Sequence, residues 1–86
     1  MPELCRFFGI QIAMQFNDHA PPHFHVRYGD ERATIALTPL RTLEGHLGPR
    51  VLGLVMEWAA LHERELVEDW DLVRRGVSPR RITPLQ

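Results

Sequence analysis

Apolar and polar residues alternate along three segments in the first half of the chain. From Phe8 to Phe16 every second residue is apolar, and the same pattern returns twice before residue 40. Because successive side chains of a strand point to opposite faces, each segment predicts a half-buried β-strand. Asn, Asp, Pro and Gly residues separate the segments and indicate short turns. The pattern therefore predicts a three-stranded antiparallel meander, with strands over about 7–16, 23–28 and 32–38.

The second half of the chain has a helical period instead. Residues of an apolar stripe recur there at spacings of three and four, namely Leu52, Val55, Ala59, Leu66, Trp70 and Val73, with His62 in the same stripe. This stripe predicts one long helix over about 49–75 that packs on the sheet. Pro49 suits the first helical position and Gly76 a left-handed cap. Residues 39–48 are predicted as an irregular connection and 76–86 as a tail, so the expected fold is a single α+β domain over 1–86.

The lengths of the predicted elements do not match. A helix over 49–75 would be about 40 Å long, whereas strands of about six residues span roughly 20 Å. We therefore expect half of the helix to overhang the sheet, with Leu66, Trp70 and Val73 on the overhang. The segment 82–85 is expected to fold back over part of this surface. The apolar surface that this segment leaves uncovered predicts a partner chain, in a homodimer or a heterodimer.

Composition describes a small globular domain. The chain has 86 residues, of which 44% are hydrophobic and 24% charged, and its formal net charge of -1 gives no general attraction to nucleic acid or membranes. The start of the sequence lacks the apolar stretch of a signal peptide, and no apolar run is long enough to span a bilayer. The lone Cys5 fits a reducing compartment. These features predict a cytoplasmic protein with no membrane partner.

The second predicted strand carries the candidate chemistry. Its alternation places His23, His25 and Arg27 on one face and apolar residues on the other. Together with His19 in the preceding turn, the two histidines form the pattern H-x-x-x-H-x-H. Imidazole is the commonest neutral metal ligand, so His19, His23 and His25 could hold a divalent metal such as zinc. An ordinary solvated face is the alternative.

The same residues also allow chemistry without a metal. Two imidazoles with an ordinary pKa of about 6.5 can act as general base and general acid. Arg27 beside them could bind a phosphate and stabilise negative charge. This arrangement would suit a ribonuclease that cleaves RNA through its 2′-hydroxyl group, so RNA is a candidate partner. Any surface with two histidines and an arginine would meet the same description.

Several segments resemble one family of small bacterial proteins, the domain of unknown function 4160 family. The most specific is the string Asp18-His19-Ala20-Pro21-Pro22-His23-Phe24-His25-Val26. Arg6-Phe7-Phe8-Gly9-Ile10, Leu43-Glu44-Gly45 and the helical segment from Glu57 to Trp70 extend the resemblance over nearly the whole chain. The resembling segment continues through Arg27 to Gly29. Asp18, His23, His25 and Arg27 match it and share a plausible face, so they are the candidate catalytic residues.

The resemblance implies a genomic and functional context. Proteins of this kind are commonly encoded beside a small protein of the domain of unknown function 2442 family. That arrangement resembles a bacterial type II toxin-antitoxin pair in which this chain is the toxin-like member, with an antitoxin-like protein as its cognate partner. A metal-binding protein or metal-dependent hydrolase that uses His19, His23 and His25 is the first alternative. A non-enzymatic protein interaction module is the second.

Overall fold

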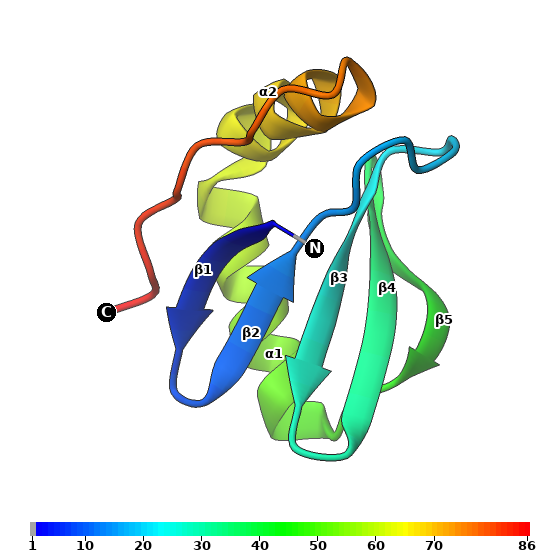
Figure 1. The fold of residues 1–86 in the computed structure, drawn as a ribbon. Coiled ribbons are helices and arrows are strands. Elements are labelled where there is room, and N and C mark those ends of the chain that lie inside the picture. The colour runs from blue at the N-terminus through cyan, green and yellow to red at the C-terminus, as the bar shows by residue number, and fades with distance from the viewer. Residues whose placement is uncertain (1) are drawn as a thin grey trace.

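The computed structural model describes residues 2–86 and contains five strands followed by two helices (Figure 1). The elements are β1 (Glu3–Phe7), β2 (Ile10–Ala13), β3 (His23–Tyr28), β4 (Glu31–Leu37), β5 (Leu40–His46), α1 (Pro49–Leu61) and α2 (Glu63–Arg74). Neighbouring strands pair antiparallel in the order β1-β2-β3-β4-β5. The α+β class and the antiparallel meander are confirmed, whereas the prediction of three strands and one helix is wrong.

The first predicted strand, 7–16, includes a turn and only one strand. Phe8 and Gly9 form the turn with φ angles of 50° and 80°, and Phe7 pairs with Ile10 across it. β1 therefore precedes the turn and forms a hairpin with β2. Phe8 belongs to the alternating pattern but is 54% exposed. The pattern runs through the turn because a turn residue is itself apolar, so periodicity could not locate where β2 begins.

The connection predicted as irregular, 39–48, contains strand β5. Leu37 and Leu40 pair across a two-residue turn of Thr38 and Pro39. Proline has no N–H to give to a sheet, but in a turn between strands it removes no ladder hydrogen bond. Pro39 therefore joins two strands here instead of ending the regular structure, and the sheet gains a fifth strand.

A β-bulge bends β5. Thr34 pairs with Glu44 and Ile35 pairs with Thr42, so Leu43 is an extra residue on the β5 side. Bulges increase the local twist of a strand and redirect its side chains. β5 accordingly curves along its length at one edge of the sheet (Figure 1).

The predicted single helix is broken at His62. This residue has φ -122° and ψ 27°, outside the helical region, and its Nδ1 lies 2.6 Å from Oε1 of Glu65. The break turns α2 across the end of the sheet (Figure 1). Three residues of the apolar stripe are buried there, namely Leu66, Trp70 and Val73. The helix therefore does not overhang, and the argument for a partner chain that rested on an overhang is removed.

The ends of the helical region agree with the prediction. Pro49 is the first residue of α1, and Gly76 has a φ of 76° just after α2. Among residues 2–86, no helix combines the length and the apolar composition needed to cross a lipid bilayer.

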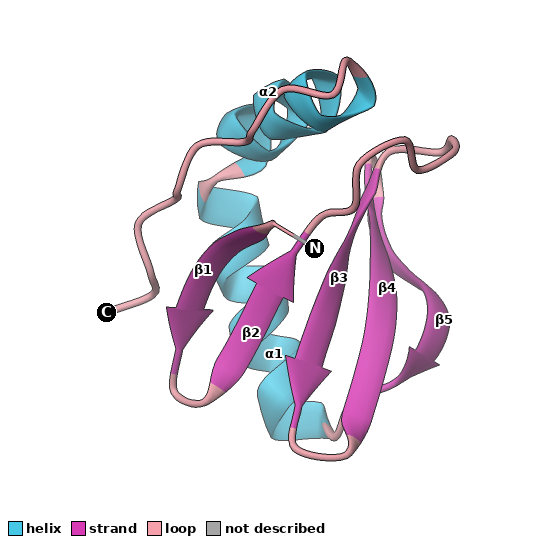
Figure 2. Ribbon diagram, viewed as in Figure 1, coloured by secondary structure: helices cyan, strands magenta, loops and turns pink. Residues whose placement is uncertain are grey.

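The tail 76–86 returns along β1. The backbone N–H of Ile82 donates to the carbonyl of Leu4, and Nε1 of Trp58 donates to the carbonyl of Thr83 at 2.8 Å. Trp58 belongs to α1 and is fully buried, with its ring near those of Phe7 and Phe24 in the sheet. The helices and the tail thus cover one face and one edge of the sheet, and its other face has no helix over it (Figure 2).

Candidate active site

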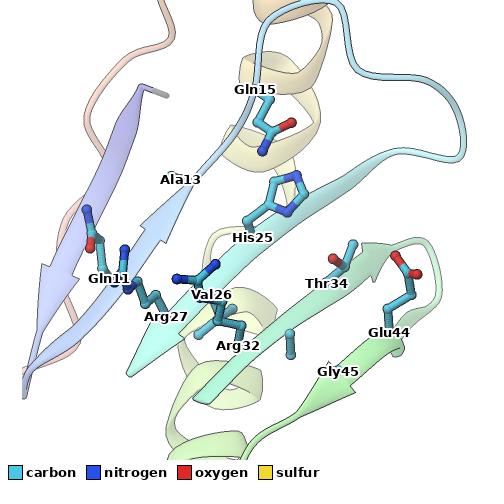
Figure 3. A pocket seen from close by; sticks show the side chains of 11 residues that line it. Gln11, Ala13, Gln15, His25, Val26, Arg27, Arg32, Thr34, Glu44 and Gly45 are labelled. Atoms are coloured by element: carbon cyan, nitrogen blue, oxygen red, sulfur yellow. The ribbon is translucent and has the colours of Figure 1, made fainter. Parts of the chain in front are cut away.

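Strand β3 directs His25 and Arg27 to the open face of the sheet, as its alternation predicts (Figure 3). His23 begins the same strand but is only 6% exposed. The indole of Trp70 in α2 packs on its imidazole, with ring centroids 4.9 Å apart. The imidazole of His25 approaches it from another side at 5.0 Å. One of the two histidines is therefore held beneath α2, while the other is accessible.

The carboxylate of Asp18 joins the two imidazoles. Its Oδ2 lies 2.8 Å from Nε2 of His23 and 3.0 Å from Nε2 of His25. Its Oδ1 accepts a hydrogen bond from the backbone N–H of His19. The Asp18 side chain is 12% exposed. The turn between β2 and β3 therefore points this carboxylate inward and brings together three of the residues selected from the sequence.

Both ring nitrogens of His23 face hydrogen-bond acceptors. Nδ1 lies 2.7 Å from the carbonyl oxygen of Pro21, and Nε2 faces the carboxylate of Asp18. A neutral imidazole has a single N–H and can satisfy one of these acceptors. The other contact needs a second proton or a metal ion between nitrogen and oxygen. An imidazole N–H bonded to a backbone carbonyl is the usual arrangement behind a metal-ligating histidine.

The electrostatics of Asp18 favour its charged form. Burial acts to raise the pKa of this carboxyl, but the hydrogen bonds from His25 and His23 outweigh it and lower the pKa below its ordinary value of 3.8. The side chain is therefore a carboxylate at neutral pH. An ionised oxygen between two imidazoles can hold a cation or orient a ring for proton transfer.

The donor set fits a divalent metal. The ligand atoms of Asp18, His23 and His25 all lie within 4.8 Å of one another. Zinc and similar ions bind nitrogen and carboxylate oxygen at about 2.0–2.2 Å, which places ligand atoms roughly 3–3.6 Å apart. The two Asp18 contacts, at 2.8 and 3.0 Å, are close to this spacing, so small shifts of the three side chains would complete the site. Two imidazoles and one carboxylate are also the donors of the metal triad that leaves open coordination positions for reactants.

His19, the third ligand predicted from the sequence, lies outside this group. Its side chain is 94% exposed, and its Nδ1 is 3.6 Å from Oδ1 of Asp18. The carboxylate of the preceding residue, Asp18, occupies the position that was expected for the imidazole of His19. The H-x-x-x-H-x-H spacing could not distinguish these two neighbours, because the conformation of the turn decides which of them points inward.

A hollow of about 330 Å³ lies on the open face beside His25 (Figure 3). It is lined by Gln11, Ala13, Gln15, His25, Val26, Arg27, Arg32, Ala33, Thr34, Glu44 and Gly45. A second hollow of about 140 Å³ includes Asp18 and His23 and shares His25, Thr34 and Glu44 with the first. The shared residues connect the Asp18 cluster to the larger hollow.

Two charged lining residues, Arg32 and Glu44, were missed by the sequence analysis. Arg32 lies directly opposite Arg27 in the β3–β4 pair. The turn at Gly29 and Asp30 already indicated this register, so a count along the two strands could have found it. Glu44 comes from β5, where no strand was predicted, and the sequence held no signal that would place it beside His25.

The bulged strand lies very close to β4. Gly45 has a φ of 83°, and a Cβ built on it would lie 2.2 Å from the carbonyl oxygen of Arg32. Only glycine fits both the left-handed backbone and the close approach. Gly45 thereby fixes the position of the part of β5 that carries Glu44.

The model of one protein family, described as Domain of unknown function (DUF4160), matches residues 9–71. This segment is more than half of the chain, and it contains Asp18, His23, His25, Arg27 and Glu44. No curated protein and no solved structure matches the chain. The chain therefore belongs to the DUF4160 family.

Proposed function

We propose that this protein is a metal-dependent hydrolase whose divalent ion, zinc in the first place, is held by Asp18, His23 and His25. One observation carries the proposal: His23 faces an acceptor with each nitrogen, and one of those acceptors is a carboxylate oxygen that also approaches Nε2 of His25. A cation at Nε2 satisfies both nitrogens of a neutral His23 and the charge of Asp18 together.

Each residue has a distinct role in this proposal. Asp18 and His25 bind the ion on the side of the hollows, and His23 binds it from beneath α2. The Nδ1–H of His23 donates to Pro21 and holds the ring in its orientation. A bound divalent ion supplies a Lewis acid and lowers the pKa of a coordinated water. Glu44 lines both hollows and can accept a proton there.

We also propose that the protein is the toxin-like member of a two-protein bacterial module in the cytoplasm. Membership of the DUF4160 family supports this context, through the gene arrangement that the resemblance implies. The partner could act on an edge of the sheet. Within residues 2–86, β5 pairs with β4 alone, so its outer edge can accept another strand. A strand added there would lie beside Glu44 and restrict entry to the hollows.

A second candidate is metal-independent cleavage of RNA. The 3.0 Å contact between Oδ2 of Asp18 and Nε2 of His25 favours it, because a carboxylate that orients an imidazole is a common device for general base catalysis. In this case His23 donates protons to both Asp18 and Pro21, as a cation. The two candidates differ in one property that can be measured directly, the metal content of the protein.

Elemental analysis tests the metal proposal. Protein purified without an affinity tag should contain a stoichiometric divalent ion, and Asp18→Asn or His25→Ala should lose it. His19→Ala is the matched control and should retain the ion, because His19 lies outside the cluster. Wild-type protein without metal after reconstitution with zinc would contradict the proposal, and so would full retention by Asp18→Asn.

Induced expression tests the toxin-like role. Growth of the native host should stop, and coexpression of the neighbouring protein should restore it. His25→Ala should abolish the arrest, whereas His19→Ala should preserve it. Harmless expression in the native host would contradict this role. Arrest that survives both His23→Ala and His25→Ala would instead favour a non-enzymatic interaction module.

A further inference from the structure

The open face of the sheet places two arginines directly opposite each other. Arg27 and Arg32 are a cross-strand pair, and like charges in this position are destabilising. None of the ion pairs within residues 2–86 involves either side chain. The pair therefore concentrates positive charge at one place that the protein itself does not neutralise.

The hollow around this pair is polarised. Arg27 and Arg32 lie together at one part of it, while Glu44 lies apart from them beyond Thr34 (Figure 3). His25 lies opposite Thr34 and two residues from Arg27 along β3, and it is therefore about 7 Å from Arg27 along the strand. A ligand with an anionic group at the arginines would thus extend toward His25 and the Asp18 cluster.

The size and lining of the hollow restrict the ligand. Its volume of about 330 Å³ is at the lower end of the range for small-molecule sites. No Phe, Tyr or Trp is among its lining residues, so it offers no aromatic platform for a run of stacked bases. A compact anionic ligand fits these properties better than several bases bound in succession.

We propose that this hollow binds a phosphate ester of nucleotide size, with the phosphate held by Arg27 and Arg32. The guanidinium group presents a rigid fork of donors that matches phosphate oxygens, so two opposed arginines form a strong phosphate clamp. The part of the ester beyond the phosphate extends toward the Asp18 centre, and this placement rests on the proposed function.

Calorimetric titration with uridine monophosphate tests the phosphate clamp. Arg27→Ala and Arg32→Ala should each weaken binding by about tenfold or more, as expected for lost hydrogen bonds to a charged group. Arg64→Ala, on the exposed side of α2, is the matched control and should change binding by less than about twofold. Uridine without phosphate should not bind measurably, and inorganic phosphate should bind more weakly than the nucleotide.

The outcomes that overturn the clamp are equally direct. Uridine that binds as well as uridine monophosphate would remove the role of the phosphate. Equal effects of Arg27→Ala, Arg32→Ala and Arg64→Ala would reduce the clamp to a general charge effect. Inorganic phosphate that binds as tightly as the nucleotide would leave a simple anion site and overturn the proposed size of the ligand.

The source of the ester is tested with a short single-stranded RNA. Tighter binding of this RNA than of the mononucleotide, with the same dependence on Arg27 and Arg32, would identify a phosphate within RNA as the ligand. Equal or weaker binding would identify the free nucleotide. Both results support the phosphate clamp if the arginine dependence holds.

Repeating the titration after chelation separates this inference from the proposed function. Arginine-dependent binding in a protein that never contains metal would refute the metal centre and keep the phosphate clamp. If the metal-loaded protein binds the nucleotide equally well with and without Arg27→Ala or Arg32→Ala, the clamp is refuted and the metal centre is still supported.

Discussion

The indole ring of Trp70 packs on the imidazole of His23, and their ring centroids are 4.9 Å apart. This contact links helix α2 to the first residue of β3. It buries His23 and limits its movement to the orientation in which Nδ1 meets the carbonyl of Pro21. The break at His62 makes the contact possible, because it turns α2 across the end of the sheet. The geometry of the Asp18 cluster therefore depends on a helix that contributes no ligand to it.

Replacement of Trp70 should affect both folding and the cluster. Trp70→Ala removes a large buried side chain, and we expect a loss of about 3–5 kcal/mol in the free energy of unfolding. Trp70→Phe should lose less and remain folded, with metal affinity reduced by about tenfold or more. Urea denaturation and zinc titration measure these effects. Val67→Ala, on the exposed side of α2, is the control, and an equal loss in this variant would contradict the role of Trp70.

The buried carboxyl of Asp69 should make stability depend on pH. Its Oδ1 accepts a hydrogen bond from the backbone N–H of Arg80, while its Oδ2 has no partner within residues 2–86. Burial raises the pKa of Asp69, Glu65 and Glu68 raise it further, and Arg80 opposes the shift. The folded state therefore binds the proton more tightly than the unfolded state. Stability from this group is full below about pH 3.9 and is lost as pH rises through the raised folded pKa.

Asp69→Asn tests this dependence. The free energy of unfolding of the variant minus that of the wild type should increase as pH rises from about 4 to 7. A constant offset is expected in addition, because the amide N–H₂ group is buried without an acceptor. Urea denaturation at several pH values measures the difference. Asp71→Asn, an exposed position on the same helix, is the control, and a flat difference for Asp69→Asn would contradict the prediction.

Gly45 should be intolerant of any side chain. Gly45→Ala combines a left-handed backbone with a Cβ 2.2 Å from the carbonyl oxygen of Arg32, so β5 must shift away from β4. Gly29→Ala is the matched control, because Gly29 has a φ of 57° and open space around it. We expect Gly29→Ala to lose about 1–2 kcal/mol in the free energy of unfolding and Gly45→Ala distinctly more. Equal losses would show that β5 can move freely.

The tail should contribute to the stability of the whole domain. Ile82 is buried, and its backbone N–H donates to Leu4 in β1. Ile82→Ala should lower the free energy of unfolding by about 2–4 kcal/mol. Val77→Ala, at an exposed position of the same tail, should change it by less than about 0.5 kcal/mol. Thermal denaturation distinguishes the two, and a loss no larger for Ile82→Ala than for Val77→Ala would mean that the tail is detached.

Local sequence patterns predicted those elements whose signals are confined to a few neighbouring residues. β3 spans His23–Tyr28 as predicted, and β4 spans Glu31–Leu37, close to the predicted 32–38. α1 begins at Pro49, and α2 ends at Arg74, one residue before the predicted end. These limits depend on side-chain alternation, turn residues and helix caps, which act within a few residues of chain and are visible in the sequence.

Long-range contacts decided the rest. The number of strands depended on whether 3–7 and 40–46 found partners, and neither segment has strong alternation of its own. The break at His62 depended on the length of the sheet, because a straight helix would have left Trp70 in water. Burial of an apolar stripe can outweigh the continuity of a helix.

In the candidate site, too, the sequence predicted some relationships and the tertiary structure decided others. Alternation along β3 placed His25 and Arg27 on one face, because a strand directs every second side chain to the same side. The turn signal at Gly29 and Asp30 likewise placed Arg32 opposite Arg27. By contrast, the conformation of the β2–β3 turn directed Asp18 inward in place of His19, and helix α2 covered His23. These last relationships join residues that are distant in sequence or separated by a turn. Their geometry comes from chain packing, which local residue patterns do not specify.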